Sequence, residues 1–271
     1  MAIAPHLNAQ SDKFPGDSTP QPPFGLLDSI RSLAIYSVGI PHFTAWTAFV
    51  LGVSRFMDLK HVDKALKLMS KAVPRLAGIE VSVLGQEAID PARPYVFVAN
   101  HVNIFDMFTL YQAIPQFTRS LELAEHFSWP VFGSFISAVG QIPVDPENPR
   151  ITAKGLKKAA QMLLAGDSIV VLPEGERTLD GSVGHFYKGA FRLAVKTKVE
   201  VVPIAISGGR TVSRRGDWRV RPGKIEVVFG APVSTEHLTL GDADFLAGEC
   251  RQIIIDLLQK RRQPAAINQP Q

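Results

Sequence analysis

A histidine and an aspartate five residues apart stand where a buried strand is expected to give way to a helix. They are His101 and Asp106, in the segment Ala-Asn-His-Val-Asn-Ile-Phe-Asp at 99–106. Five residues turn a regular helix by about 500°, so the side chains can meet only if His101 lies in a loop and Asp106 in the first helical turn. An aspartate that holds an imidazole fixes its tautomer and stabilises the imidazolium. The pair is therefore predicted to supply a catalytic general base.

The sequence offers no protein nucleophile to act with this base. It contains no GxSxG, GxGxxG or GxxxxGKS/T pattern, and its one cysteine, Cys250, falls on the apolar face of an expected C-terminal helix. A base without a protein nucleophile indicates that the substrate supplies the nucleophile, as when an alcohol attacks an activated acyl group. One cysteine and seven scattered histidines also exclude a disulfide framework and a local metal motif, so neither a metal nor a bound cofactor is expected.

A second group of polar residues follows another expected strand, in the segment VVLPEGERT at 170–178. The glycine of this segment, Gly175, would let the backbone approach a ligand closely. Arg177 could hold a phosphate through two parallel hydrogen bonds, or could instead pair with a neighbouring glutamate. Lys188 lies further along the chain and would add a second positive charge.

Alternating strand and helix patterns after residue 78 must position these side chains. Short β-rich runs alternate with amphipathic helical patterns, which predicts an α/β layered domain with a mostly parallel central sheet flanked by helices. Strands are expected at 79–84, 95–99, 168–172, 200–206 and 224–229, and helices at about 104–113, 131–138, 151–165, 188–197 and 243–261.

The N-terminal part of the chain is apolar and is expected to associate with a membrane. Residues 32–54 contain no Asp, Glu, Lys or Arg, and as one helix they would be about 35 Å long, enough for a hydrocarbon core of about 30 Å. Pro41 cannot continue helical hydrogen bonding, so two short helices, in a membrane or in a protein core, fit at least as well. A basic amphipathic pattern at 60–76 suits an anionic membrane surface. If the apolar segment spans the membrane, the excess of basic residues after it predicts that the following domain is cytoplasmic.

Four blocks of the sequence together resemble the 1-acylglycerol-3-phosphate acyltransferases, the PlsC-like glycerolipid acyltransferases. Residues 100–106 resemble the NHxxxxD motif of that family, and LPEGERT at 172–178 resembles its FPEGTRS block. Residues 133–145 are similar to the block between these two, and VPIAISG at 202–208 matches a later VPV-type strand. The blocks occur in the family's order and cover about residues 95–210.

The resemblance implies an α/β acyltransferase domain, with the N-terminal apolar helical element docked in one leaflet of a membrane, which for a bacterial protein would be the inner or plasma membrane. It implies transfer of a fatty acyl group from acyl-CoA or acyl-carrier protein to a lysophospholipid, most directly 1-acylglycerol-3-phosphate to give phosphatidic acid. Carried over residue by residue, His101 deprotonates the acceptor hydroxyl and Asp106 orients His101. The implied substrate-binding residues are Asn100, Glu174, Gly175, Arg177, Lys188 and Arg150.

Two positions depart from the family pattern. The middle block usually ends in Asp-Arg, whereas here Asp145 is followed by Pro146 and the nearest arginine is Arg150. The threonine of FPEGTRS is replaced by Glu176. The loss of a cation and the gain of a carboxylate both weaken a phosphate site. An acyltransferase for a zwitterionic lysolipid, such as lyso-ornithine lipid, is therefore an alternative.

Composition and length are consistent with an enzyme of this size. The 271 residues are 46% hydrophobic and 20% charged, which is typical of a globular protein, and the net charge of +4 is too small to indicate nucleic-acid binding. Two alternatives remain. One is a thioesterase, and the other is a non-catalytic membrane-surface binding protein that uses 60–76 and the arginine-rich segment 210–224. The predicted division is a flexible tail at 1–25, a membrane-associating helical segment at 26–77, an acyltransferase domain at 78–262 and a flexible tail at 263–271.

Overall fold

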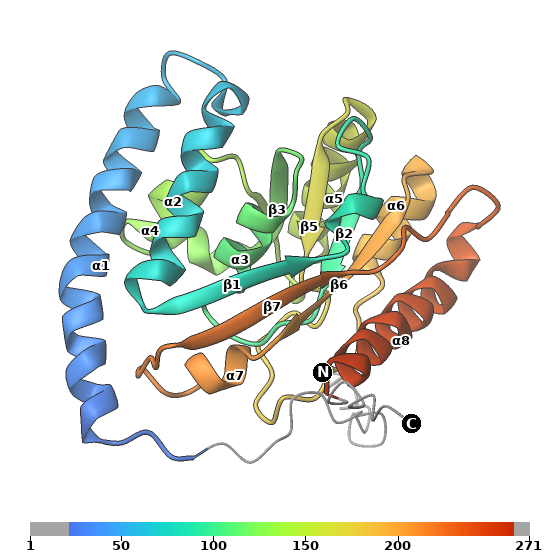
Figure 1. Cartoon of the computed structure of the whole chain (residues 1–271). Coiled ribbons are helices and arrows are strands. Elements are labelled where there is room, and N and C mark those ends of the chain that lie inside the picture. Colours follow the sequence, from blue (N-terminus) through green and yellow to red (C-terminus); the bar gives the residue numbers. More distant parts are fainter. Residues whose placement is uncertain (1–21, 263–271) are drawn as a thin grey trace, which may run out of the picture.

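Seven strands form one sheet with the order β1-β7-β6-β2-β5-β3-β4 in the computed structural model, which describes residues 22–262 (Figure 1). All neighbouring strands are parallel except β6 and β7, which are antiparallel. Strands β6, β2, β5, β3 and β4 therefore run in one direction, and their carboxyl ends meet along one edge of the sheet. The strands are β1 (Ile79–Leu84), β2 (Val96–Ala99), β3 (Thr118–Leu123), β4 (Ile142–Val144), β5 (Ser168–Val171), β6 (Val201–Ser207) and β7 (Gly223–Phe229).

The mostly parallel α/β sheet expected from the sequence is confirmed, but it has two more strands than expected. The five predicted strands all form, with ends shifted by one residue at most. The sequence of β3, TRSLEL, contains two charged residues, and β4 has only three residues, one of them a proline. Neither resembles the continuous apolar run of a buried parallel strand, so both were missed.

Helices cover both faces of the sheet. In β2, Val96 and Val98 pack into a core formed with α5, α6 and α8, whereas Phe97 and Ala99 point into a second core beneath α2 and α3. A third, smaller apolar cluster joins α1, α2 and α4. The helices are α1 (Leu26–Val53), α2 (Asp63–Leu76), α3 (Asp106–Ala113), α4 (Phe132–Ala138), α5 (Pro149–Leu164), α6 (Gly189–Thr197), α7 (Gly209–Val212) and α8 (Ala243–Arg262).

Helix α1 is one continuous helix of 28 residues and is not broken at Pro41. The interpretation as two short helices is therefore wrong. The polar side chains of this stretch bond within the helix, since Thr44 donates to the carbonyl of Ile40 and Thr47 to that of Phe43, both at 2.9 Å. Such bonds satisfy the hydroxyls without breaking the helix.

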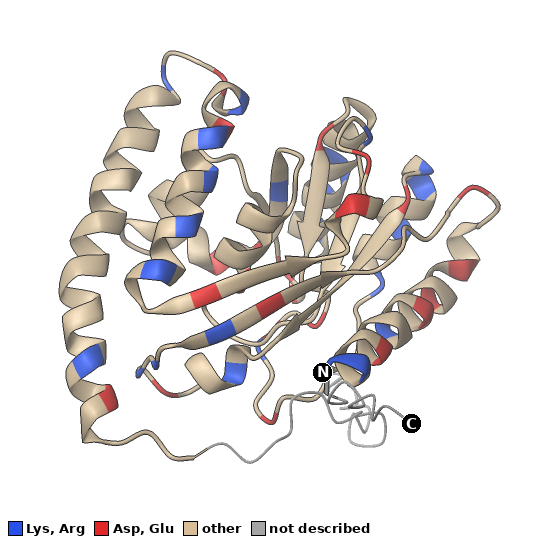
Figure 2. Cartoon of the chain, viewed as in Figure 1, with Lys and Arg blue, Asp and Glu red and all other residues tan. Residues whose placement is uncertain are grey.

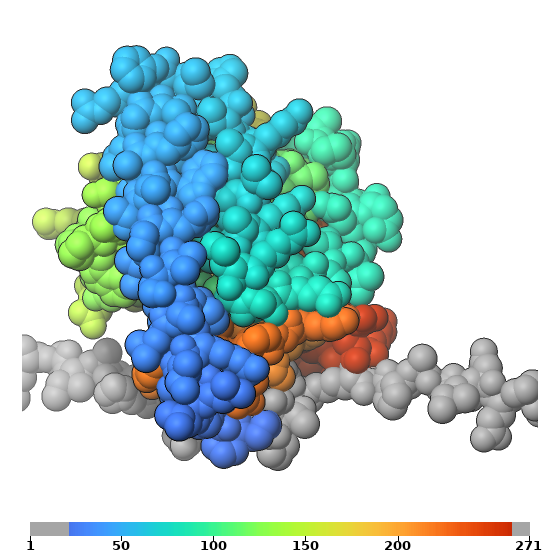
Figure 3. Space-filling view, turned by 60° about the vertical axis from the view of Figure 1, so that its left-hand side comes forward, coloured from blue at the N-terminus to red at the C-terminus, as the bar shows by residue number. Residues whose placement is uncertain are grey.

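Helix α1 lies along the outside of the molecule and exposes most of its apolar side chains. Figure 3 shows it as a continuous ridge on the surface, and Figure 2 shows that it carries almost no charge. It is long and apolar enough to cross a membrane, by length and composition, and only 11% of its most apolar window is buried. It is also fixed to the domain, because Ser32 donates to the carbonyl of Val220 and Arg221 pairs with Asp28 at 2.7 Å.

The arginine-rich segment 210–224 uses several of its cations to hold the start of this helix. The guanidinium groups of Arg214, Arg219 and Arg221 lie 4.7, 5.3 and 4.8 Å from the ring of Phe24. Arg219 also donates to the carbonyl of Phe24 at 3.0 Å. Phe24 falls within the flexible tail that was predicted for 1–25, and residues 22–25 of that tail are described; the remaining predicted tail residues, 1–21 and 263–271, lie outside the described part of the chain.

The basic pattern at 60–76 is divided between the interior and the surface. Lys67 donates to the carbonyl of Pro115 at 2.6 Å and pairs with Asp63, so it is not available to a membrane. The remaining basic residues of α2 are exposed along one side of the helix, beside α1 (Figure 2); they are Lys64, Lys71 and Arg75.

Candidate active site

The His101–Asp106 pair forms at the carboxyl end of β2, the strand between β5 and β6. His101 lies in the loop after this strand, and Asp106 is the first residue of α3, which is the arrangement that their spacing requires. Nδ1 of His101 lies 2.7 Å from Oδ2 of Asp106. With Nδ1 donating to the carboxylate, Nε2 is the unprotonated nitrogen and can accept a proton.

Asp106 is completely buried and organises the whole loop. Besides the imidazole, its Oδ2 accepts the backbone amides of Val102 and Asn103, at 2.6 and 2.9 Å. These amides precede the first turn of α3, where a helix N-terminus favours a negative charge. The carboxylate therefore fixes the loop conformation and the ring orientation together.

Glu174, expected to bind substrate, is instead buried behind the loop and fixes it from the other side. Its Oε1 accepts the backbone amide of His101 and its Oε2 that of Gly184, both at 2.7 Å. Burial raises the pKa of Glu174 to about 7, although the two amides and the charge of His101 lower it. With both oxygens occupied by backbone, Glu174 is a positioning residue.

This shift predicts a pH-dependent stability that Glu174→Gln removes. The native state holds a proton on Glu174 between pH 4.5 and about 7, whereas the unfolded chain has lost it. Stability from this group is thus full below pH 4.5 and is lost as pH rises through 7, by about 3 kcal/mol. Urea unfolding at pH 5 and pH 8 measures the effect. The free energy of unfolding should fall further between these two pH values in the wild type than in Glu174→Gln. Equal losses in both proteins would contradict the shift.

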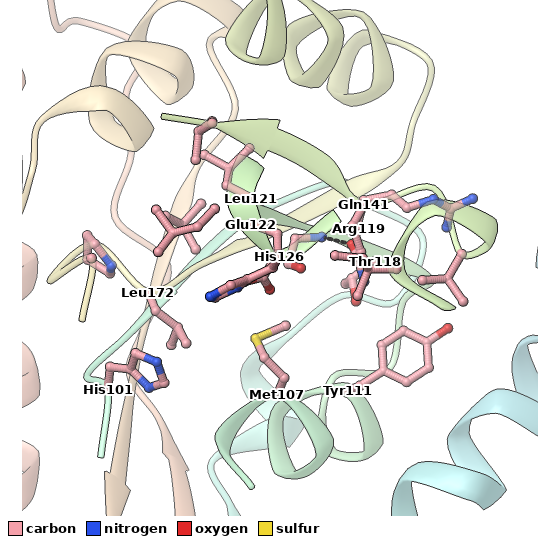
Figure 4. Close-up of a pocket in the computed structure, with 18 of the residues that line it drawn as sticks. His101, Met107, Tyr111, Thr118, Arg119, Leu121, Glu122, His126, Gln141 and Leu172 are labelled. Carbon is pink, nitrogen blue, oxygen red and sulfur yellow. Dashed lines mark hydrogen bonds and ion pairs between the residues drawn. The ribbon is translucent and has the colours of Figure 1, made fainter. Parts of the chain in front are cut away.

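A cavity of about 650 Å³ opens beside His101 and extends along the sheet edge toward β3 and β4. Most of its lining is aliphatic and aromatic, as Figure 4 shows for Met107, Leu121 and Leu172. In that view His101 lies at one end of the labelled residues, and Gln141 and Arg119 lie at the other. Its volume and apolar character suit a hydrocarbon chain whose reactive end lies at His101.

Three of the predicted substrate-binding residues line this cavity, all from the segment after β5: Gly175, Arg177 and Lys188. Gly175 has φ +75°, and a Cβ there would come 3.0 Å from the ring of Tyr187, so this position requires glycine. In the described part of the chain, the guanidinium of Arg177 makes no ion pair or hydrogen bond. Lys188 is exposed at the rim, 3.3 Å from a carboxylate oxygen of Asp244.

Two other predicted substrate-binding residues lie elsewhere. The side chain of Asn100 is buried, donating to the carbonyl of Ile206 at 2.9 Å and accepting its amide at 2.7 Å. These bonds join the ends of β2 and β6, so the side chain of Asn100 serves the backbone of the site. Arg150 is exposed in the first turn of α5 and is not among the residues that line the cavity, although Thr152 and Leu156 of the same helix are.

Several residues at the site were not anticipated from the sequence. Asn103 is fully buried, donates to the carbonyl of Gly209 and accepts the amide of Phe105, both at 2.8 Å. An Asn three residues before a helix start is a turn signal that could have been read from the sequence. Within the cavity, His126 pairs with Glu122 at 2.6 Å, a contact for which the sequence gives no signal beyond the four-residue spacing. Cys250 is buried in the core, where burial raises its pKa to about 12, so it is no nucleophile.

The fold and this site together define an acyltransferase domain, and comparison with known proteins gives the same class. The Acyltransferase family model matches residues 80–207. The chain is 31% identical over 198 residues to human 1-acyl-sn-glycerol-3-phosphate acyltransferase alpha, covering 73% of this chain and 70% of that protein. It is 28% identical over 268 residues to a 1-acyl-sn-glycerol-3-phosphate acyltransferase of Chlamydomonas reinhardtii, covering 95% of this chain and 78% of that one.

The chain belongs to the 1-acyl-sn-glycerol-3-phosphate acyltransferase family. Its fold is that of a solved member, the 1-acyl-sn-glycerophosphate (LPA) acyltransferase PlsC from Thermotoga maritima, with a TM-score of 0.77 at 23% identity. The match covers 88% of this chain and 98% of the Thermotoga chain, so the shared fold includes more than the region matched by the family model.

Proposed function

We propose that this protein transfers a fatty acyl group from a thioester donor to the free hydroxyl of 1-acyl-sn-glycerol 3-phosphate, giving phosphatidic acid. The observation that carries this is the His101–Asp106 pair at the mouth of an apolar cavity that also includes Arg177. A base, a hydrocarbon-sized cavity and an unpaired guanidinium are what an acyl transfer to a phosphate-bearing alcohol needs. Membership of the family agrees with this reaction.

The reaction needs one proton carrier and no covalent enzyme intermediate. Nε2 of His101 takes the hydroxyl proton as the acceptor oxygen attacks the thioester carbonyl. The carbon–sulfur bond then breaks, and the imidazolium returns its proton to the departing thiolate. Asp106, 2.7 Å from the ring, stabilises the imidazolium between these steps. The donor is acyl-CoA or acyl-carrier protein.

The acceptor phosphate is placed at the end of the site where Arg177 and Lys188 lie. Arg177 can hold it with two parallel hydrogen bonds, and Lys188 adds a point charge at the rim. Glu176, which suggested a zwitterionic acceptor, does not present a free carboxylate, because Arg215 donates to it at 2.5 Å. One of the two grounds for a lyso-ornithine acceptor is thereby removed; the other, Pro146 in place of the family's arginine, still stands.

An acceptor panel tests this function. Purified protein would receive labelled acyl-CoA or acyl-carrier protein with lysophosphatidate, lysophosphatidylcholine, lyso-ornithine lipid or no acceptor. We expect transfer to lysophosphatidate at a higher kcat/KM than to the other lipids. Preference for a lipid without a phosphate monoester would refute the assignment, and fatty acid release that ignores the acceptor would indicate a thioesterase.

The protein associates with membranes through its N-terminal apolar helix, and we propose that α1 lies in one leaflet of the cytoplasmic face. The bonds from Ser32 to Val220 and from Arg221 to Asp28 hold α1 against the domain, which is difficult to combine with a full span. The exposed cations of α2 lie beside it, where they would meet anionic head groups. In this proposal residues 26–77 form the membrane-associating segment and 78–262 the acyltransferase domain.

Charges on α1 should release the protein from vesicles. Leu27 and Ile30 are each 57% exposed, and Leu27→Glu with Ile30→Glu replaces two apolar contacts with carboxylates. We expect vesicle binding to fall at least about tenfold, because each buried side chain contributes 1 kcal/mol or more. Co-sedimentation with vesicles of phosphatidylglycerol measures this. Leu164→Glu, at an exposed position of α5, is the control. An equal loss of vesicle binding in both variants would exclude a specific role for α1.

A further inference from the structure

An arginine outside the four sequence blocks holds the loop that carries the acceptor-binding cation. Nη2 of Arg215 donates to Oε2 of Glu176 at 2.5 Å, and its Nη1 donates to the backbone carbonyl of Arg177 at 3.0 Å. One guanidinium thus contacts both the carboxylate beside the proposed phosphate site and the backbone of the residue that lines it. The side chain of Glu176 is 68% exposed and that of Arg215 33%.

The segment that carries Arg215 contacts both loops of the site. Arg210 donates to the carbonyls of Leu179 and Asp180, at 3.0 and 2.8 Å, further along the loop that follows β5. The carbonyl of Gly209 accepts from Asn103 in the loop of the catalytic pair. Residues 209–215 therefore fix the position of the loop after β5, which carries Arg177, relative to the loop after β2, which carries His101.

The charges near Arg177 explain why the contacts of Arg215 matter for binding of the acceptor. Glu176 is adjacent to Arg177 in sequence, and an unpaired carboxylate there would repel a phosphate dianion and compete for the guanidinium of Arg177. Arg215 neutralises that carboxylate and keeps it turned toward the 209–215 segment. The site then presents Arg177 to the acceptor without Glu176 as an opposing charge.

We propose that Arg215 determines the affinity for the phosphate acceptor, by neutralising Glu176 and holding the backbone of Arg177. It is a positioning residue, because it acts through these two neighbours. This inference rests on the proposed function and deepens it, since it names what makes a loop with an added carboxylate compatible with a phosphate-bearing substrate.

A mutant cycle tests the proposal in detergent micelles with lysophosphatidate and acyl-CoA. Arg215→Met should raise KM for lysophosphatidate about fivefold and change kcat by less than about twofold. Adding Glu176→Gln to this variant should return KM to within about twofold of the wild type, because the repelling charge is gone. The effect of Arg215→Met should also shrink when salt is raised from about 0.05 M to about 0.5 M.

Arg261→Met is the matched control, since Arg261 forms a similar surface pair with Glu226, at 2.6 Å, and neither residue lines the cavity. It should leave KM unchanged. An Arg215→Met variant with unchanged KM, or with a lower kcat and melting temperature that Glu176→Gln does not restore, would overturn the inference while leaving the function intact. A wild type that makes no phosphatidate from lysophosphatidate would overturn both.

Discussion

Replacing His101 with alanine is expected to lower the rate of acyl transfer by at least about 10²-fold, because the acceptor hydroxyl loses its general base. The ring is 21% exposed, and its contacts are the one to Asp106 and the cavity. Its removal should therefore leave the fold and the melting temperature almost unchanged. Initial rates with saturating donor and lysophosphatidate measure the effect.

His237→Ala serves as the control, because His237 is an exposed histidine in the loop before α8. It should retain wild-type rates. A His101→Ala protein within tenfold of the wild type, at the same melting temperature, would show that the proton goes elsewhere and would remove His101 from the mechanism.

Asp106→Asn is expected to reduce transfer about 10²-fold or more, although the substitution changes few atoms. Oδ2 of Asp106 accepts three N–H groups, while Oδ1 is buried without a partner among residues 22–262. An asparagine either leaves the imidazolium without a counter-charge or directs an N–H toward the ring and the amides. Either outcome raises the energy of the proton-transfer step and lowers the stability of the loop.

The kinetic test compares kcat of Asp106→Asn, His101→Ala and the double variant. The two residues act as one unit, so removing both should cost little more than removing one. We expect kcat of the double variant to lie within about threefold of kcat of the slower single variant. Asp256→Asn, an exposed change on α8, controls for loss of charge. Multiplicative losses in the double variant would show that Asp106 acts independently of His101.

Much of the fold could be predicted because the central strands are continuous apolar runs. β2 (VFVA) and β5 (SIVV) are buried at every position, as parallel strands between two helical layers must be. β3 and β4 stand nearer the edge of the sheet, and their sequences are mixed or very short. Their pairing depends on tertiary contacts that a local pattern does not report.

The site was predictable where residue roles follow from local geometry. The spacing of His101 and Asp106 allowed contact only across a loop and a first helical turn, and the structure has that contact. The roles of Asn100 and Glu174 depended on backbone groups distant in sequence, Ile206 in one case and His101 in the other. A polar side chain in a motif can serve a ligand or the backbone, and only the fold shows which.

The loop after β5 shows that the effect of a charge is also difficult to predict from the sequence alone. From the sequence alone, Glu176 counted as an added negative charge at the phosphate site. The structure supplies its partner from a segment 39 residues away, through the bond from Arg215. Charge counts along a motif therefore predict a site poorly when the fold brings a counter-charge from a segment distant in the sequence.

The measurement that tests the central claim most directly is the ratio of phosphatidate formed to thiol released by the wild-type protein. Acyl-CoA labelled in the acyl chain would be supplied with lysophosphatidate, and both products followed in the same reaction. Direct transfer predicts one phosphatidate for each thiol, and almost no thiol without lysophosphatidate. Release of thiol and free fatty acid without phosphatidate would contradict the account. So would the absence of thiol release both with acyl-CoA and with acyl-carrier protein as donor.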